Sequence, residues 1–315
     1  MRYTRLSFAG SPAEVRAQWL EARKKGVGGS DVGAIMGLSP YRTALDVWLE
    51  KTGRTEPPDL AGNAAVEWGN RLEDVVAAKF AENHPELTVR RVNAILQDVE
   101  HRHRLASLDR AGTDRNTGER FVLEVKTAGE RAADQWADGV PLWYAAQVVH
   151  YLNVTGWTFA YMAVLNGGRD YREYVVEPDA ADREEVAAAV DTFWADYVLA
   201  DQMPAVVGED APALAAMYTE DSGENLEGRD GDVMAYMLAC QCLERAKAEK
   251  EQRAAELMAR IGDAKGLETP RYRVTWSRGL SKRFDAKALK EADPETYEKF
   301  VTTSTRNNGL RIKEL

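Results

Sequence analysis

Two carboxylates and a lysine occur close together between residues 104 and 127, in the run RLASLDRAGTDRNTGERFVLEVKT. Asp109 follows an apolar segment, and Glu124 and Lys126 stand two positions apart in a strand-like segment. Because side chains alternate along a strand, Glu124 and Lys126 point to the same face of the sheet. The apolar residues around them indicate a central strand, in which a charged group needs a partner or a metal ion.

A pair of carboxylates is the kind of donor set that Mg²⁺ prefers. We expect Asp109 and Glu124 to bind Mg²⁺ and Lys126 to position or help deprotonate a water molecule, which suits phosphodiester hydrolysis. Asp114 is a rival ligand, but Asp109 is favoured because it ends a predicted strand whereas Asp114 lies in the middle of a loop. The alternative is an ordinary exposed ion pair between Glu124 and Lys126.

The surrounding elements predict an α/β fold, in which a mixed central sheet is flanked by helices. Helical patterns cover 13–24, 39–53, 68–82, 141–156 and 179–200, and strand patterns cover 87–96, 101–108, 120–128, 157–165 and 171–177. Ser39 is the expected N-cap of the second helix, and Asn166-Gly167-Gly168 predicts a hairpin. Glu73 lies at the edge of an apolar helical stripe, and Gln147 is a polar residue inside another.

The segment KKGVGGSDVGAIMG places glycines and a capping serine before a helical pattern. The backbone N–H groups of such a turn suit a phosphate, although glycine turns also serve as hinges. The segment is not a Walker A loop, because Gly-Lys-Ser/Thr does not follow at the required spacing. In the helix at 68–82, one apolar face is expected to consist of Trp68, Leu72, Val75, Val76 and Phe80.

The net charge of −10 over 315 residues argues against a protein that coats nucleic acid with its whole surface, but it leaves room for a local basic groove. Such a basic wall is expected from Arg102, Arg104, Arg110, Arg115 and Arg120. We expect no membrane span and no secretory signal, hence a cytoplasmic protein in a bacterial host.

The chain is expected to divide into a main domain at 1–203, an acidic linker at 204–230 and a smaller α+β extension of unknown role at 231–315. Cys240 and Cys242 are expected to be small packing residues rather than a zinc site. Trp136 and Trp143 are expected to pack between helices rather than stack on a base. His101 and His103 are expected on a basic strand end near a DNA phosphate.

Five motifs occur in order along residues 15–200: RKKGVGGSDVGAIMG, EWGNRLED, ASLD, LEVKT and YAAQVVHYL. The pattern of Asp and then Glu-x-Lys resembles the PD-(D/E)xK nuclease core, a restriction-endonuclease-like fold. The flanking motifs are similar to those of YqaJ-type phage recombinases, the family that also includes lambda exonuclease. Relatives often have Gly directly after the motif aspartate, whereas Arg110 stands here. The turn at this point is therefore expected to differ.

The resemblance implies a role for several further residues. Metal binding would involve the carbonyl oxygen of Val125 as a third ligand and Glu73 as an accessory acid acting through water. Gln147 would orient the attacking water or a substrate phosphate, with Tyr144 close to it. A pocket for the 5′-terminal phosphate of DNA would comprise Arg23, Ser30 and Ser107.

The resemblance also implies an activity, namely a Mg²⁺-dependent deoxyribonuclease, with Mn²⁺ as a substitute, that degrades duplex DNA as a 5′-to-3′ exonuclease in phage-type recombination. A homo-oligomer, specifically a trimer, and a single-strand annealing protein as partner are implied by the family alone. Three alternatives remain: an endonuclease on branched or nicked DNA, a catalytically silent DNA-binding protein, and a C-terminal unit that docks a protein partner.

Overall fold

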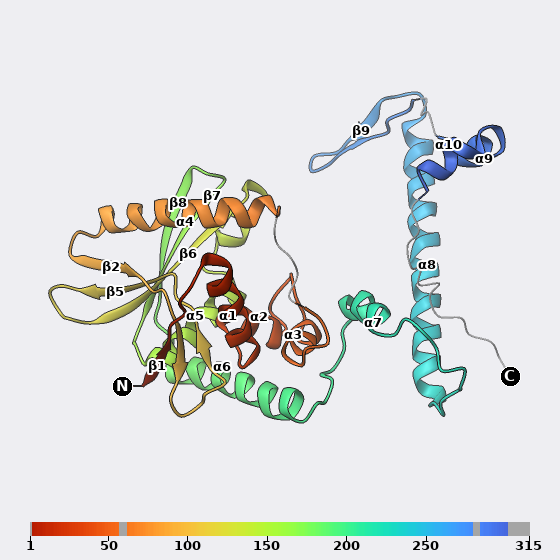
Figure 1. The fold of residues 1–315 in the computed structure, drawn as a ribbon. Coiled ribbons are helices and arrows are strands. Elements are labelled where there is room, and N and C mark those ends of the chain that lie inside the picture. The colour runs from red at the N-terminus through yellow and green to blue at the C-terminus, as the bar shows by residue number, and fades with distance from the viewer. Residues whose placement is uncertain (1, 57–61, 280–283, 302–315) are drawn as a thin grey trace. The chain divides into compact units, whose positions relative to one another are not determined.

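The computed structural model describes residues 2–56, 62–279 and 284–301 (Figure 1). Its internal contacts divide the chain into two compact units, Met1–Met217 and Tyr218–Leu315. All residues predicted to form a site lie in the first unit, whose architecture is described first.

The first unit is built on two sheets. The main sheet has five strands in the order β2-β5-β6-β7-β8, and a small sheet has three strands in the order β1-β3-β4. The main strands are β2 (Leu87–Arg91), β5 (Arg110–Asp114), β6 (Arg120–Ala128), β7 (Ala160–Asn166) and β8 (Asp170–Val176). The small strands are β1 (Tyr3–Leu6), β3 (Ile95–Asp98) and β4 (Leu105–Ala106). The β6–β7 pair is parallel and every other pair is antiparallel, so the main sheet is mixed.

Helices cover both faces of the main sheet. The helices of the first unit are α1 (Pro12–Lys24), α2 (Gly29–Ile35), α3 (Ala44–Lys51), α4 (Ala64–Asn83), α5 (Leu142–Thr155), α6 (Ala180–Thr192) and α7 (Ala211–Met217), with the shorter helical segments η1 (Glu130–Trp136), η2 (Phe193–Leu199) and η3 (Gly208–Asp210). On one face α4 lies along the sheet (Figure 1), and Phe80 shares a core cluster with Phe121 and Leu123. On the other face α5 packs on Val122 and Met162. The predicted α/β class with a mixed sheet between helices is confirmed.

The strand β5 differs from the sequence-based expectation. The pattern had placed Asp109 at the end of a strand, with a turn after it, whereas Asp109 directly precedes β5. The run RAGTD lacks a regular apolar alternation and therefore looked like a turn. Gly112 makes the strand feasible, because a Cβ at this position would lie 2.0 Å from the Phe121 ring. The predicted strand at 87–96 is likewise split between β2 and β3, which lie in different sheets.

Two helix predictions need correction. Ser39 does not cap α3; its Oγ accepts hydrogen bonds from the backbone N–H groups of Tyr41 and Arg42 in the preceding turn, and Thr43 is the N-cap. The N–H of Asp46 donates to the Thr43 hydroxyl and the N–H of Thr43 donates to the Asp46 carboxylate, so this capping box satisfies two N–H groups. In α4 the expected apolar face is only partly buried. Val76 and Phe80 belong to the core, whereas Trp68 and Val75 are exposed.

The small sheet is tied to α5 by a buried histidine. Burial lowers the pKa of His150 to about 4, so the imidazole is neutral in the folded protein. Its Nε2 lies 3.0 Å from the carbonyl oxygen of Leu105 and therefore donates the hydrogen bond. This hydrogen bond holds β4 against the middle of α5. The chain then leads from β4 to Asp109.

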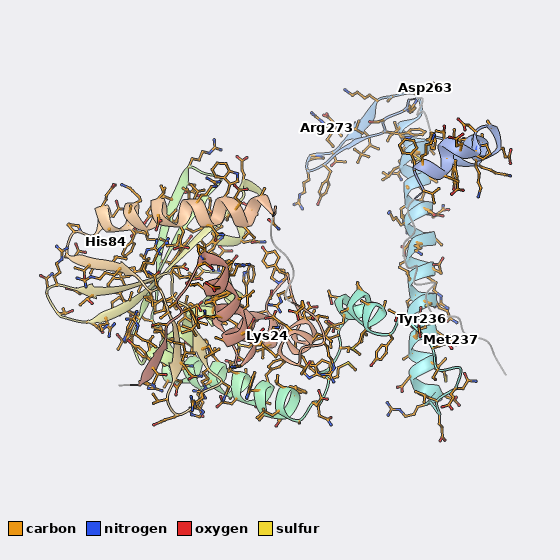
Figure 2. The ribbon with its side chains drawn as sticks, in the orientation of Figure 1. Lys24, His84, Tyr236, Met237, Asp263 and Arg273 are labelled. Carbon is orange, nitrogen blue, oxygen red and sulfur yellow. The ribbon has the colours of Figure 1, made fainter. Side chains whose placement is uncertain are left out.

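The second unit contains α8 (Asp230–Ile261), the hairpin of β9 (Gly266–Glu268) and β10 (Arg273–Thr275), α9 (Ala286–Ala292) and α10 (Pro294–Lys299). Cys240 and Cys242 are exposed on α8, so the expectation that they pack in a core is wrong. The same helix exposes Tyr236 and Met237 (Figure 2). Within the described residues, no helix has both the length and the apolarity needed to cross a membrane.

Part of the expected linker belongs to the first unit. Residues 204–217 lie there, with η3 and α7 formed by 208–217, and Asp210 is buried rather than solvated. The Oδ2 atom of Asp210 accepts a hydrogen bond of 2.7 Å from the N–H of Val207. Leu214 and Met217 pack against the core that contains Phe193. The boundary therefore follows Met217, because apolar side chains anchor a segment whose composition alone looks solvated.

Candidate active site

Strand register brings the two carboxylates and the lysine together. Arg110 of β5 pairs with Leu123 of β6, so Asp109, one residue earlier, lies beside Glu124. The Oδ2 atom of Asp109 accepts a hydrogen bond of 2.9 Å from the N–H of Val125. The Nζ of Lys126 lies 2.7 Å from Oε1 of Glu124. The pair predicted to share one face of a strand therefore makes direct contact, and Asp109 completes the cluster.

With both carboxylates ionised, the cluster would hold more negative charge than its one lysine balances. Burial and the Glu124 carboxylate raise the pKa of Asp109 to about 8. Burial opposes the charge of Lys126, but the carboxylates of Glu124 and Asp109 raise its pKa above the ordinary value. Glu124 is only 2% exposed, and its Oε2 is a buried oxygen without a hydrogen-bond partner among the described residues. Such an orphaned oxygen next to a second carboxylate fits a hard divalent cation.

Helix α5 supports the cluster from one side of the sheet. The Nε2 of Gln147 donates to Oε1 of Glu124 at 2.7 Å and to the hydroxyl of Tyr151 at 3.0 Å, and its Oε1 accepts from Lys126 at 3.2 Å. The Tyr144 ring centroid lies 4.6 Å from Nζ of Lys126, which is a cation–π contact. The predicted helix and both of its polar residues are therefore at the cluster, where Gln147 holds Glu124 and Lys126 in place.

Helix α4 approaches from the opposite side, and its acidic residues are already paired. The guanidinium of Arg110 contacts both Glu73 and Asp74. Arg91 contacts the same two carboxylates, at 3.4 and 2.7 Å. Arg110 itself is only 5% exposed. Sequence reasoning missed the partners of Arg110, although an arginine next to the motif Asp109 was a signal, because a buried guanidinium requires a carboxylate.

The rival ligand Asp114 lies at the other end of β5. Its Oδ1 accepts hydrogen bonds from the N–H groups of Asn116 at 2.6 Å and Thr117 at 3.2 Å. This is an Asx-type turn, which explains the side chain by local structure. The structure thus places Asp109, rather than Asp114, beside Glu124.

The predicted phosphate pocket is built around a buried aspartate. The Nη2 of Arg23 lies 2.9 Å from Oγ of Ser30 and 3.4 Å from Oδ1 of Asp31. Burial alone would raise the pKa of Asp31, but Lys51, Arg23 and Arg42 hold it well below its ordinary value. Asp31 and Lys51, 2.9 Å apart, were not recognised from the sequence, where nothing marks them as a pair.

Ser107, the third residue expected in this pocket, lies in the short link between β4 and β5, two positions before Asp109. The same part of the chain is joined to the glycine-rich segment, because the N–H of Leu105 donates to the carbonyl of Val27 at 2.9 Å.

The glycines of KKGVGGSDVGAIMG allow close packing of helices. A Cβ on Gly29 would lie 2.4 Å from the Tyr151 ring and 3.0 Å from Cγ of Gln147. A Cβ on Gly33 would lie 2.8 Å from Cβ of Trp143. Because only glycine leaves this space, α2 can rest directly on the part of α5 that supports the carboxylates.

We therefore expect Gly29→Ala to destabilise the first unit by roughly 1–3 kcal/mol, because the added methyl group overpacks a rigid contact. Urea-induced unfolding measures this change. Gly208→Ala is the matched control, since a Cβ there would have no neighbour within 4 Å. Equal unfolding free energies for the two variants would show that the close approach of α2 and α5 is not required.

Other residues highlighted by the sequence have structural partners. Asp191 of α6 accepts from Nε2 of His103 at 2.7 Å, lies 3.6 Å from Nδ1 of His101 and also pairs with Arg104. These histidines therefore face a carboxylate, which corrects the expectation of a basic face. The geometry of His101, His103 and Asp191 would admit a metal ion, but Arg104 already neutralises Asp191.

Trp136 is buried and stacks on Tyr144, so its predicted packing role is confirmed.

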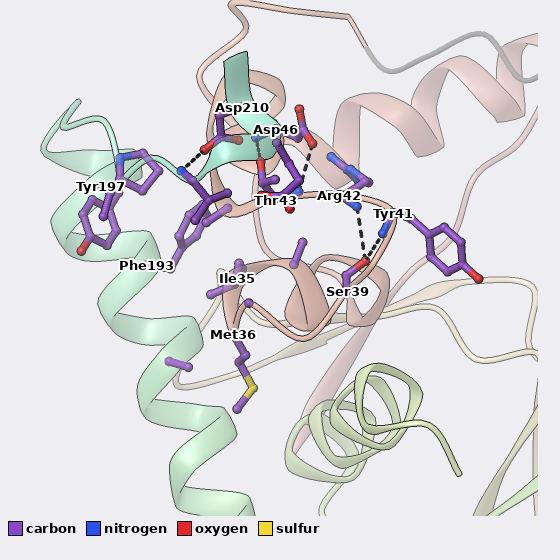
Figure 3. Close-up of a pocket in the computed structure, with 18 of the residues that line it drawn as sticks. Ile35, Met36, Ser39, Tyr41, Arg42, Thr43, Asp46, Phe193, Tyr197 and Asp210 are labelled. Atoms are coloured by element: carbon purple, nitrogen blue, oxygen red, sulfur yellow. Dashed lines mark hydrogen bonds between the residues drawn. The ribbon is translucent and has the colours of Figure 1, made fainter. Parts of the chain in front are cut away.

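A separate cavity of about 950 Å³ lies between the α2–α3 loop, α6 and the segment 204–210 (Figure 3). Its lining includes Ile35, Met36 and Phe193 (Figure 3). Ser39 and Thr43 also line it, and each accepts a hydrogen bond from a nearby backbone N–H group, that of Tyr41 and of Asp46 respectively. None of the clustered carboxylates contributes to it, so we do not assign it to the active site.

A model of the YqaJ-like viral recombinase domain matches residues 18–158, which include the whole cluster. A protein of Bacillus subtilis (strain 168) described as the uncharacterized protein YqaJ is 33% identical over 309 residues, 95% of each chain. The relative therefore shares most of the second unit as well as the first.

Among solved structures, an alkaline exonuclease from Laribacter hongkongensis matches 59% of this chain and 93% of its own at 19% identity, with a TM-score of 0.48. Its complex with dAMP gives 20% identity over the same shares, with a TM-score of 0.47. The family match and the full-length relative establish kinship, and the chain belongs to the family of proteins with a YqaJ-like viral recombinase domain.

Proposed function

We propose that this protein is a divalent-metal-dependent deoxyribonuclease that degrades duplex DNA from its 5′ ends, in recombination of the phage type. The observation that carries the proposal is the orphaned, buried oxygen of Glu124 beside Asp109, with Lys126 in contact with the same carboxylate. A structural ion pair would satisfy both oxygens of a buried glutamate, whereas a metal site leaves one free for the ion.

Asp109, Glu124 and the carbonyl oxygen of Val125 would hold Mg²⁺ or Mn²⁺. When bound, the metal ion would neutralise charge on the scissile phosphate and lower the pKa of a nearby water. Lys126 would orient that water and donate to the developing negative charge. Gln147 contacts both Glu124 and Lys126, so we assign it the positioning of these two groups.

Glu73 would act as the accessory acid, with Arg110 fixing its carboxylate near Asp109. The two acids are close enough that the charge of Glu73 contributes to the raised pKa of Asp109. A paired Glu73 adds less repulsion to the site than a free one. We infer that Glu73 keeps its role as the accessory acid even though Arg110 stands where relatives often have glycine.

Arg23, Ser30 and Ser107 would bind the terminal 5′-phosphate. A guanidinium can make two parallel hydrogen bonds to a phosphate, which favours a doubly charged end over an internal phosphodiester. Arg23 is oriented for this role by Asp31 and by the Trp19 ring, whose centroid lies 4.8 Å from the guanidinium carbon. A homo-oligomer, a trimer by resemblance, and a single-strand annealing protein as partner are proposed from kinship alone.

The test is digestion of linear duplex DNA, with and without a 5′-phosphate, alongside a covalently closed circle, in Mg²⁺ or Mn²⁺. We expect loss of the linear DNA only, and faster loss with the 5′-phosphate. Cutting of the circle would favour an endonuclease instead. Absence of cutting in both metals would favour a DNA-binding protein without activity.

Arg23→Gln tests the terminal-phosphate pocket, with Arg16→Gln as the matched control on an exposed position of the same helix. We expect Arg23→Gln alone to remove the preference for 5′-phosphorylated ends. If both variants keep the preference, the phosphate is recognised elsewhere.

A further inference from the structure

A second concave surface of the first unit is rich in arginine. It is a cavity of about 620 Å³ between the small sheet and the β2–β5–β6 side of the main sheet. Arginines reach it from three strands of two sheets: Arg5 from β1, Arg90 from β2 and Arg120 from β6. Arg91 of β2 also borders it, although its guanidinium points to α4 on the other face. We call this cavity the arginine groove.

Strand register explains why these side chains meet. Thr88 of β2 pairs with Thr113 of β5, and Thr113 pairs with Arg120 of β6, so the three form one row across the sheet. Arg90 stands in the next row, opposite Ala111. Residues two apart on a strand share a face, so Arg90 lies on the same side as Thr88. The face carrying these rows is opposite to the one that packs on α4.

Aromatic residues form one wall of the groove. Arg120 lies over Trp157, with its guanidinium carbon 4.3 Å from the ring centroid. Tyr3 of β1 meets Trp157 edge to face, with ring centroids 6.4 Å apart. Trp157 is 9% exposed and is therefore held by the core. The position of Arg120 is set by this rigid ring, which leaves its N–H donors free for a ligand.

The positive charge of the groove is not balanced within it. Its lining contains the four arginines and no aspartate or glutamate. Arg91 is neutralised from the other face by Glu73 and Asp74. Arg5 and Arg90 form no ion pair with any residue in the described ranges. In a protein of net charge −10, a pocket with unpaired guanidinium groups is a site for an anion.

The groove is separate from the active site but close to it. Arg120 precedes Glu124 by four residues on β6, which corresponds to roughly 13 Å along the strand. Val122, between them on the same face, is fully buried, so the two surfaces are divided by the core. A polyanion that extends away from the active site is therefore a better match to this placement than a single small anion.

We propose that the arginine groove binds the sugar–phosphate backbone of DNA at a point outside the active site. The inference rests on the proposed nuclease function for the identity of the polyanion. The guanidinium groups and the Thr113 hydroxyl contact phosphate oxygens, which provides affinity without sequence specificity. The Thr88 hydroxyl already donates to the carbonyl of Thr113 at 3.0 Å. The groove thereby retains the DNA while its end is at the catalytic cluster.

The test is the binding of a fluorescently labelled duplex in metal-free buffer, measured by anisotropy between 50 and 200 mM salt. We expect Arg5→Gln combined with Arg90→Gln to weaken binding roughly tenfold at the low salt concentration and to reduce the slope of log Kd against log salt by about 2. The lysine replacements at both positions keep the charge and should retain most of the slope. Arg16→Gln combined with Arg169→Gln is the control, because both arginines are exposed and lie outside the groove.

An unchanged salt slope in the groove variant would overturn the inference. So would binding of inorganic phosphate alone, detected by calorimetry and lost in the variant while duplex binding stays intact, because the ligand would then be a small anion. Cleavage assays on the same proteins separate this inference from the nuclease proposal. If the wild-type protein never cuts DNA but the groove variant binds DNA more weakly, the nuclease proposal is refuted and the groove inference is supported. If the wild-type protein cuts DNA normally and the groove variant keeps the wild-type salt slope, the nuclease proposal is supported and the groove inference is refuted.

Discussion

Replacement of Lys126 by alanine is expected to reduce the rate of DNA cleavage by about 10²–10⁴-fold, the range typical of a group that moves or positions a proton. Lys126 is the cation that contacts both Glu124 and Gln147, at 2.7 and 3.2 Å. Without it, nothing on this strand orients the attacking water or balances the charge that develops on the phosphate. The measurement is single-turnover cleavage of a linear duplex at saturating Mg²⁺, so that binding does not limit the rate.

Lys79→Ala is the matched control for this experiment. Lys79 lies on the exposed surface of α4, where it pairs with Glu82 at 3.4 Å. Both variants should bind duplex DNA in metal-free buffer, because the loss assigned to Lys126 lies in the chemical step. If Lys126→Ala cuts at the wild-type rate, the cluster is a structural ion pair and the proposed mechanism is wrong.

Arg110→Met is expected to lower the free energy of unfolding by roughly 2–4 kcal/mol, because it removes one partner of a largely buried ion pair. Arg110 has a side chain that is 6% exposed, and it joins β5 to α4 through Glu73 and Asp74. Both carboxylates reach water, which keeps the loss below that of a fully buried pair. Cleavage should slow as well, because Glu73, left with only the more exposed Arg91 as a partner, would then add more negative charge beside Asp109.

Arg91→Met is the matched control, since Arg91 contacts the same two carboxylates from a side chain that is 49% exposed. Such an exposed pair is worth about 0–1 kcal/mol. A double-mutant cycle of Arg110→Met with Glu73→Gln, followed by urea unfolding, isolates the coupling between the two residues. Equal losses for Arg91→Met and Arg110→Met, or additive effects in the cycle, would show that Arg110 does not position Glu73.

Local sequence was sufficient for the features that depend on near neighbours in the chain. The alternation along β6 put Glu124 and Lys126 on one face, because successive side chains of a strand point to opposite sides. Gly167 and Gly168 adopt positive φ angles of 57° and 72°, as the predicted hairpin turn requires. The helical period of the apolar residues around Gln147 likewise predicted that its side chain faces inward, and Gln147 is 6% exposed.

Tertiary structure decided what depends on contacts between distant segments. The partners of Arg110 lie 36 and 37 positions earlier in the chain, so no local pattern could identify them. Gly29 is required only because α5 passes within van der Waals distance of α2. Residues 204–217 looked like solvated linker until the core around Phe193 provided a surface for Leu214.

By itself, then, the sequence determined the class of fold, the residues we propose for the chemistry and the faces on which they lie, since each depends on periodicity and spacing along one element. The pairing register of β2, β5 and β6 and the docking of α2, α4 and α5 were decided only in the folded chain. Those long-range contacts place Asp109 beside Glu124, tie Glu73 to Arg110 and gather Arg5, Arg90 and Arg120 into one groove. The physical reason is that register and docking depend on the packing of the whole core, which no single segment encodes.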